Sequence, residues 1–297
     1  MKPKLSGRDV PPIVTAHNPR NPTSWTVVFI GEWMSQVSSQ KKLLVELATR
    51  GNLTESQFLA YSSDIAQSLL AGSLHCSSEQ LERLVASDLE LLFQLYDDHC
   101  FQGLCRKLIA DEGAELRFRC SNRMTRAGGK TTRRTYARRA RGKAWREYEI
   151  AISSFLLNDN FSANSRPISV CGYVCEHRLH ALQRIMEHEI VHLIEMLLWD
   201  NSSCAASRFR GIASRWFGHR EFNHQLITPR EKALVDHGVR PGSVVQFEYE
   251  GRAQTGIVNR ISKRATVLVP DRRGERYSDG RRYLKFYVPL ASLKRVQ

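Results

Sequence analysis

The first half of the chain carries apolar residues at helical spacing. A helical pattern begins near Lys41, and two later segments open with the capping-box pattern, at Thr54 and at Ser77. The second capping box predicts a long helix over residues 78–109 that is interrupted near Gly103. This part of the chain is therefore expected to be largely helical.

The second half changes from helical to strand-like patterns. Residues 148–157 predict a strand, and residues 176–199 predict a long, mostly apolar helix. Further on, β-rich runs are separated by glycines and turns, at 244–250, 255–261, 265–270 and 285–290. Such closely spaced short strands predict a small SH3-like barrel. The predicted fold class is α+β: a helical N-terminal part, a domain with a small sheet and a long helix, and a small all-β barrel.

The chain length sets the number of domains. With 297 residues it is long enough for about two domains. Residues 1–36 are rich in proline and polar side chains and predict a loose N-terminal extension. We expect a helical lead-in at 37–75, the main α+β domain at 76–230 and the barrel at 240–297.

Charge and cysteine content narrow the range of functions. Lysine and arginine number 44 against 30 acidic residues, and the net charge of +14 points to a polyanionic partner such as DNA or RNA. No apolar run is long enough to span a membrane and no secretory signal is visible, so no membrane partner is expected. Seven cysteines, an odd number, argue against a disulfide framework and for a cytoplasmic location.

The predicted helix at 176–199 contains the pattern H-E-x-x-H at His188, Glu189 and His192. Histidines four residues apart lie about one helical turn apart, so both imidazoles can bind one ion while Glu189 reaches a metal-bound water. Apolar neighbours bury this turn, and buried polar side chains need partners. The alternative is a pair of core histidines bonded to backbone carbonyls, but the pattern favours zinc.

A catalytic zinc ion needs a third protein ligand. Glu195 lies on the same helix face, but it and the histidine pair span almost two turns, which is too far for one ion. A metzincin would have glycine at position 195 and histidine in place of Leu198, so that class is excluded. Downstream, the segment FGHREFNH offers His219 and His224. We favour His219, because glycine and aromatic residues surround it, and interpret His224 as a surface or supporting histidine.

A second group of potential ligands precedes the long helix. It consists of Cys171, Cys175, His177 and His180, and its first spacing resembles part of a zinc knuckle. The tight continuation into a helix start is a poor tetrahedral arrangement. Buried thiols are therefore the expected interpretation.

Several blocks stand in a fixed order along the chain: LYDDHCFQG at 95–103, RMTRAGG at 123–129, AISSFLL at 151–157, HEIVH at 188–192 and GHREF at 218–222. Together they resemble the SprT-like (Spartan-like) zinc metallopeptidase family over about residues 80–228. The resemblance implies a zincin-like domain with an active-site helix. The four-cysteine zinc ribbon that often ends these proteins is missing, and the predicted barrel stands in its place.

The resemblance also assigns roles to single residues. In the family, the histidines of H-E-x-x-H and the histidine of the later Gly-His block bind zinc, and the glutamate is the catalytic base. By resemblance, His188, His192 and His219 are the zinc ligands and Glu189 is the base.

A block of basic residues lies upstream of the motif. Residues 117–146 contain twelve lysines and arginines and no acidic residue, with Tyr136 and Trp145 interleaved. The cations of such a block can bind phosphates, and its aromatic rings can stack on bases. We expect four arginines to bind nucleic acid: Arg133, Arg134, Arg138 and Arg139. Alternatively, it is a solvated loop that confers solubility. Residues 251–297 add twelve basic residues against three acidic ones.

These observations predict a zinc-dependent metallopeptidase that hydrolyses peptide bonds through a zinc-activated water, with Glu189 as general base. The substrate would be a protein or peptide, including proteins bound to nucleic acid, held along an edge strand at 148–153. The alternative is a non-catalytic nucleic-acid-binding protein with a structural zinc site. Glu189 favours the enzyme, because a structural site has no use for a base.

Overall fold

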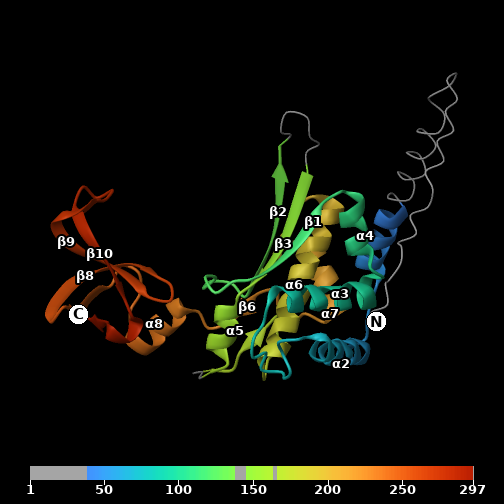
Figure 1. The fold of residues 1–297 in the computed structure, drawn as a ribbon, viewed down its shortest axis with the longest axis horizontal. Coiled ribbons are helices and arrows are strands. Elements are labelled where there is room, and N and C mark those ends of the chain that lie inside the picture. Colours follow the sequence, from blue (N-terminus) through green and yellow to red (C-terminus); the bar gives the residue numbers. More distant parts are fainter. Residues whose placement is uncertain (1–38, 138–144, 163–165, 297) are drawn as a thin grey trace, which may run out of the picture.

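The computed structural model describes residues 39–137, 145–162 and 166–296, and it begins with a group of helices (Figure 1). The capping box predicted at Thr54 is confirmed: its hydroxyl accepts from the Gln57 amide, and the Gln57 side chain accepts from the Thr54 amide. The predicted interruption is also confirmed, because Gly103, with φ 71°, separates two helices. The helices are one at 39–50, α2 (Glu55–Gly72), α3 (Ala86–Phe101) and α4 (Leu104–Asp111).

The helix predicted from residue 78 begins later, at Ala86. The Ser77 amide donates to the Glu82 carboxylate, and Leu81 has a left-handed backbone with φ 50°. These local bonds compete with helix formation, so the second capping-box prediction is wrong. α3 begins where the Asp88 carboxylate accepts from the preceding backbone amide of residue 85.

Three strands form the sheet beside the long helix: β1 (Glu115–Cys120), β2 (Gly129–Tyr136) and β3 (Trp145–Ile152). Their order is β1-β3-β2, with β1 parallel and β2 antiparallel to β3. β3 is the central strand and β2 is an edge, so the expectation of an edge strand at 148–153 is wrong. The strand also ends earlier than predicted, because Ser153 caps helix α5 (Ser154–Asn160) by accepting from the Leu156 amide.

The long helix α6 (Arg178–Trp199) is the core of this larger part of the molecule. It packs against β2 and against α7 (Ser207–Phe217). Nearly all of its residues between Leu179 and Leu198 are buried, as their apolar character predicts. A second small sheet, in the order β5-β4-β6, joins β4 (Ser169–Val170), β5 (Tyr173–Val174) and β6 (His224–Gln225).

The C-terminal part has a hydrophobic core of its own, set apart from the helical part in Figure 1. Its five strands are antiparallel in the order β10-β9-β8-β7-β11, and Ala233 of helix α8 (Pro229–His237) is buried in the same core. The predicted strands are present here, while the SH3-like barrel stays a prediction. The elements are β7 (Val244–Tyr249), β8 (Arg252–Ile261), β9 (Ala265–Arg276), β10 (Arg282–Val288), the 3-10 helix η1 (Leu290–Ser292) and β11 (Lys294–Arg295).

The molecule is mixed α+β with several small sheets, as the sequence predicts. All seven cysteines are free thiols, in line with the expectation that no disulfide framework is present. Within the described residues, no helix combines the length and apolarity that crossing a membrane requires.

Candidate metal centre

Helix α6 places the three residues of the H-E-x-x-H pattern on one buried turn. His188 is 5 % exposed and Glu189 is 2 % exposed. The Nε2 atoms of His188 and His192 lie 3.1 Å apart, as expected for residues four positions apart on a helix. The sequence pattern therefore brings two imidazole nitrogens to a single point.

The other nitrogen of His192 is held by a chain of hydrogen bonds. The Ser202 hydroxyl donates to the Glu195 carboxylate at 2.6 Å, so its oxygen accepts from His192 Nδ1, also at 2.6 Å. Arg208 donates to the other oxygen of Glu195 at 2.7 Å. Because Nδ1 carries the proton, the lone pair of His192 is on Nε2.

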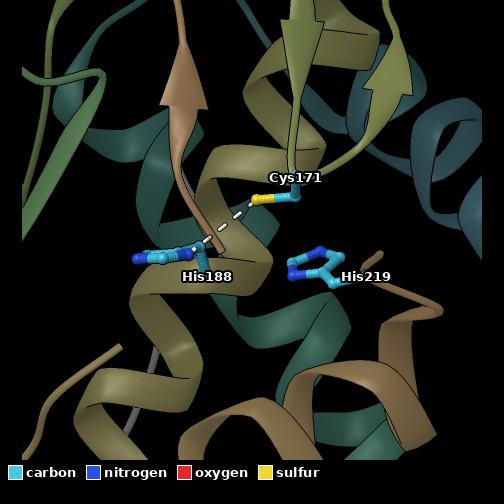
Figure 2. Close-up of side chains that lie close together, drawn as sticks. All are labelled: Cys171, His188 and His219. Carbon is cyan, nitrogen blue, oxygen red and sulfur yellow. Dashed lines mark hydrogen bonds between the residues drawn. The ribbon is translucent and has the colours of Figure 1, made fainter. Parts of the chain in front are cut away.

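His188 is oriented in a similar way, through Cys171. The thiol donates to the Arg184 carbonyl oxygen at 3.7 Å, and its sulfur lies 3.8 Å from His188 Nδ1 (Figure 2). The tautomer whose Nδ1–H points at the sulfur has its lone pair on Nε2, which faces His192. Burial lowers the pKa of His188 strongly and that of His192 to about 4. Both imidazoles are therefore neutral at pH 7.

Glu189 lies between β2 and the histidines. The Thr131 hydroxyl of β2 donates to its carboxylate at 2.8 Å, and burial raises its pKa to about 7. β2 approaches so closely that a Cβ at Gly129 would lie 2.5 Å from Glu189 Oε1. Only glycine fits at this position, which lies in the RMTRAGG block. A carboxylate with a pKa near 7 is suited to accept a proton at neutral pH.

His224 of β6 lies next to this turn. Its ring centroid is 4.5 Å from that of His188, and its donor atoms group with those of His188 and Glu189 within 4.8 Å. Its Nε2 is buried and has no hydrogen-bond partner in the part of the chain that the structure describes, and burial lowers the pKa of His224 to about 3. An unpartnered, neutral imidazole nitrogen is available as a metal ligand.

His219, the predicted third ligand, lies on the Nδ1 side of His188. Its Nε2 donates to Glu187 at 3.0 Å, and it groups with Cys171 and His188 within 4.8 Å. Figure 2 shows the His188 ring extending away from His219. Among the described residues, neither His219 nor His224 groups with both H-E-x-x-H histidines, and the group that contains both motif histidines has Cys204 as its third member. His219 as a zinc ligand stays a prediction, and His224 competes with it on geometry.

A buried ionic network below His188 was not found from the sequence. Glu187 accepts from the Tyr96 hydroxyl at 2.6 Å, from Arg184 at 3.1 Å and from His219. The Arg184 guanidinium lies 4.4 Å over the Phe58 ring and is 1 % exposed. Its sequence signal was two opposite charges three residues apart inside an apolar helix, which can stay buried only when paired.

The basic block is paired where the structure describes it. Arg133 binds Asp200 at 2.5 Å and Arg134 binds Glu147 at 3.1 Å, while Arg138 and Arg139 lie outside the described residues. Three further arginines of the block pair with carboxylates: Arg117, Arg119 and Arg146. The expectation of a solvated loop is wrong for these five, because they lie on β1, β2 and β3.

The weaker cysteine-histidine group does not assemble. Its potential ligands do not gather in one place: His177 instead caps α6, where its Nδ1 accepts from the His180 amide at 3.2 Å. Of the four residues, Cys171 alone takes part in a potential metal group within the described chain. Cys171 and Cys175 are buried thiols, as expected.

Comparison of the chain with protein-family models, with curated proteins and with solved structures gives no match.

Proposed function

We propose that the protein is a zinc-dependent peptidase. The observation that carries the proposal is the pair of Nε2 lone pairs of His188 and His192, 3.1 Å apart in a buried site. Two lone pairs at this distance repel each other unless a proton or a metal cation lies between them. Nitrogens that each bind a tetrahedral zinc ion at about 2.1 Å are separated by about 3.4 Å, so the donor pair fits zinc.

We propose His224 as the third ligand. Its Nε2 lacks any partner among the described residues, and one of its ring nitrogens groups with His188 and Glu189 within 4.8 Å. The competing residue His219 also has an unpartnered ring nitrogen, Nδ1, but it lies on the Nδ1 side of His188, away from the donor pair (Figure 2). Three neutral imidazoles with one open position form a catalytic zinc set.

The chain's own residues supply the proton chemistry. Zinc, when bound, acts as a Lewis acid toward the scissile carbonyl and the attacking water. Glu189 takes the proton of that water and passes it to the leaving amine. The Thr131 hydroxyl, at 2.8 Å, keeps the carboxylate of Glu189 oriented during both transfers.

The edge strand β2 is the proposed binding site for an extended peptide. In the described sheet, β2 pairs with β3 along one of its sides only, and it packs against α6, the helix that carries the motif. A free strand edge binds peptides by backbone hydrogen bonds. The SprT-like resemblance supports this assignment, as does the glycine pair at residues 128–129, which allows the strand to approach Glu189 and His224.

The finer fold assignments and the location belong to the same proposal. We propose an SprT-like, zincin-type catalytic domain followed by an SH3-like barrel built from β7 to β11. Free thiols suit a reducing compartment such as the cytoplasm.

The test is Glu189→Gln. This substitution keeps the shape and removes the base, so zinc content should stay at about one ion per chain while cleavage of a denatured protein falls at least roughly a hundredfold. Glu176→Gln is the matched control, because Glu176 is exposed and lies outside the H-E-x-x-H motif. Equal cleavage by wild type and Glu189→Gln would favour the alternative, a nucleic-acid-binding protein with a structural zinc ion.

A further inference from the structure

A basic cleft lies where the C-terminal sheet meets the catalytic part. Its volume is about 700 Å³, and the catalytic part contributes Arg123 and its neighbours in the loop before β2. The C-terminal sheet contributes Arg260, Lys263, Arg264 and Tyr287. Lys263 bridges the two parts: its Nζ donates to Asn122 at 2.8 Å and lies 4.5 Å over the Phe155 ring.

The sheet presents a flat row of side chains to this cleft. Arg260 pairs with Thr266, and Thr266 pairs with Tyr287, so these three residues lie side by side across β8, β9 and β10. Residues directly opposite one another share a face of the sheet. The next row, Ile261 with its partners, is buried, so the first row faces outward.

The cations of the cleft have no carboxylate partner. Among the described residues, no ion pair involves Arg123, Arg260, Lys263 or Arg264, and the lining of the cleft contains no acidic side chain. The basic block of β1 to β3 is the opposite case, since five of its arginines are paired. Unpaired cations facing one cleft create a positive potential that attracts a polyanion.

We infer that this cleft binds a single-stranded nucleic acid, with phosphates on the four cations and an unpaired base on the Tyr287 ring. The tyrosine is 65 % exposed, and an exposed aromatic ring beside a basic groove is a stacking platform for bases. A duplex hides its base faces and would leave this ring unused. Sequence preference should be slight, because stacking and phosphate contacts accept every base.

The cleft is close to the metal centre along the chain. The loop that carries Arg123 leads directly into Gly129, which contacts Glu189. If the proposed peptidase function holds, a bound single-stranded nucleic acid would bring proteins attached to it to the edge of β2. Binding of the nucleic acid itself does not depend on zinc or on Glu189.

The test is fluorescence anisotropy with labelled oligothymidine, single-stranded RNA, duplex DNA and polyglutamate, over a range of salt concentrations. The variant Arg123→Gln/Arg260→Gln/Arg264→Gln should bind oligothymidine at least about tenfold more weakly, and its log–log salt slope should become less negative by about 2. The matched control removes three exposed, ion-paired arginines: Arg50, Arg220 and Arg273. It should change both quantities little.

Tyr287 separates base stacking from general charge attraction. Tyr287→Ala should weaken oligothymidine binding about tenfold with an unchanged salt slope, and Tyr287→Phe should restore it. Equal losses in the cleft variant and its control would overturn the inference, as would tighter binding of duplex or polyglutamate than of single strands. Glu189→Gln should bind oligothymidine like wild type, so a failure of the peptidase proposal is distinguishable from a failure of this one.

Discussion

The two sides of the His188 ring differ in how fully their polar atoms are partnered. On the Nε2 side, His192 and His224 present nitrogens that have no proton donor or carboxylate to bind. On the Nδ1 side, the Cys171 thiol donates to a carbonyl oxygen and His219 Nε2 donates to a carboxylate, while His219 Nδ1 has no partner among the described residues. Both sides belong to the same buried helix and its neighbours.

Burial alone does not separate these two sides. It lowers the pKa of His192 and His224, and it lowers the pKa of His219 as well. The two candidate ligands differ in how they are held: His219 donates Nε2 to Glu187 and has an unpartnered Nδ1, whereas His224 has an unpartnered Nε2. We conclude that the unpartnered nitrogens, His224 Nε2 and His219 Nδ1, are the two candidate positions for the proposed third ligand.

The largest loss of stability should come from a substitution on the Nδ1 side of His188. Glu187→Ala removes the carboxylate that compensates the buried Arg184 guanidinium, and an unpaired buried charge costs about 3–5 kcal/mol. Urea unfolding of the zinc-free protein should show this loss of stability. Glu90→Ala, at an exposed position of α3, should stay within about 0.5 kcal/mol of wild type. A Glu187→Ala protein as stable as wild type would contradict the structural role of this side.

The second effect separates the two candidate ligands. His224→Ala should lower zinc affinity by roughly a hundredfold or more, because total affinities of about 10–16 kcal/mol are shared among a few ligands. His219→Ala should keep zinc and cost about 1–3 kcal/mol of stability, since it leaves Glu187 without one donor. Zinc titrations against a competing chelator give both affinities. The reverse pattern would make His219 the ligand, as the family resemblance implies.

Much of the fold could be predicted from local patterns. The capping box at Thr54 and the apolar run of α6 act within a few residues, so their elements lie where expected. The capping box predicted at Ser77 does not form, because the Ser77 backbone amide donates to the Glu82 carboxylate instead. Strand order could not be predicted, because β3 becomes central only through its pairing with β1, which precedes it by about thirty residues.

The candidate site could be predicted in part, because three of its residues are close together in the sequence. His188, Glu189 and His192 share one turn, so spacing alone brings them together. The third histidine returns from a distant segment, and its choice depends on the pairing of β6 with β4, which places His224 beside Val170. Five arginines of the basic block looked unpaired because their carboxylate partners lie on other segments or at its edges.

The smallest effect should come from the residue that orients a ligand without binding the metal. The Ser202 hydroxyl holds the Nδ1 proton of His192 at 2.6 Å and is itself held by Glu195. Ser202→Ala should free the His192 ring to rotate and lower zinc affinity about 10–100-fold, the usual loss for a partner of a metal-binding histidine. Ser203→Ala is the matched control, because the Ser203 backbone amide, which the substitution keeps, donates to Glu195 at 3.2 Å. Chelator competition should therefore rank the variants as His224→Ala weakest, Ser202→Ala intermediate and Ser203→Ala equal to wild type. Equal affinities for the two serine variants would show that the hydrogen bonds from Glu195 through Ser202 do not orient His192 for metal binding. That result would contradict the assignment of the metal to the Nε2 side of His188.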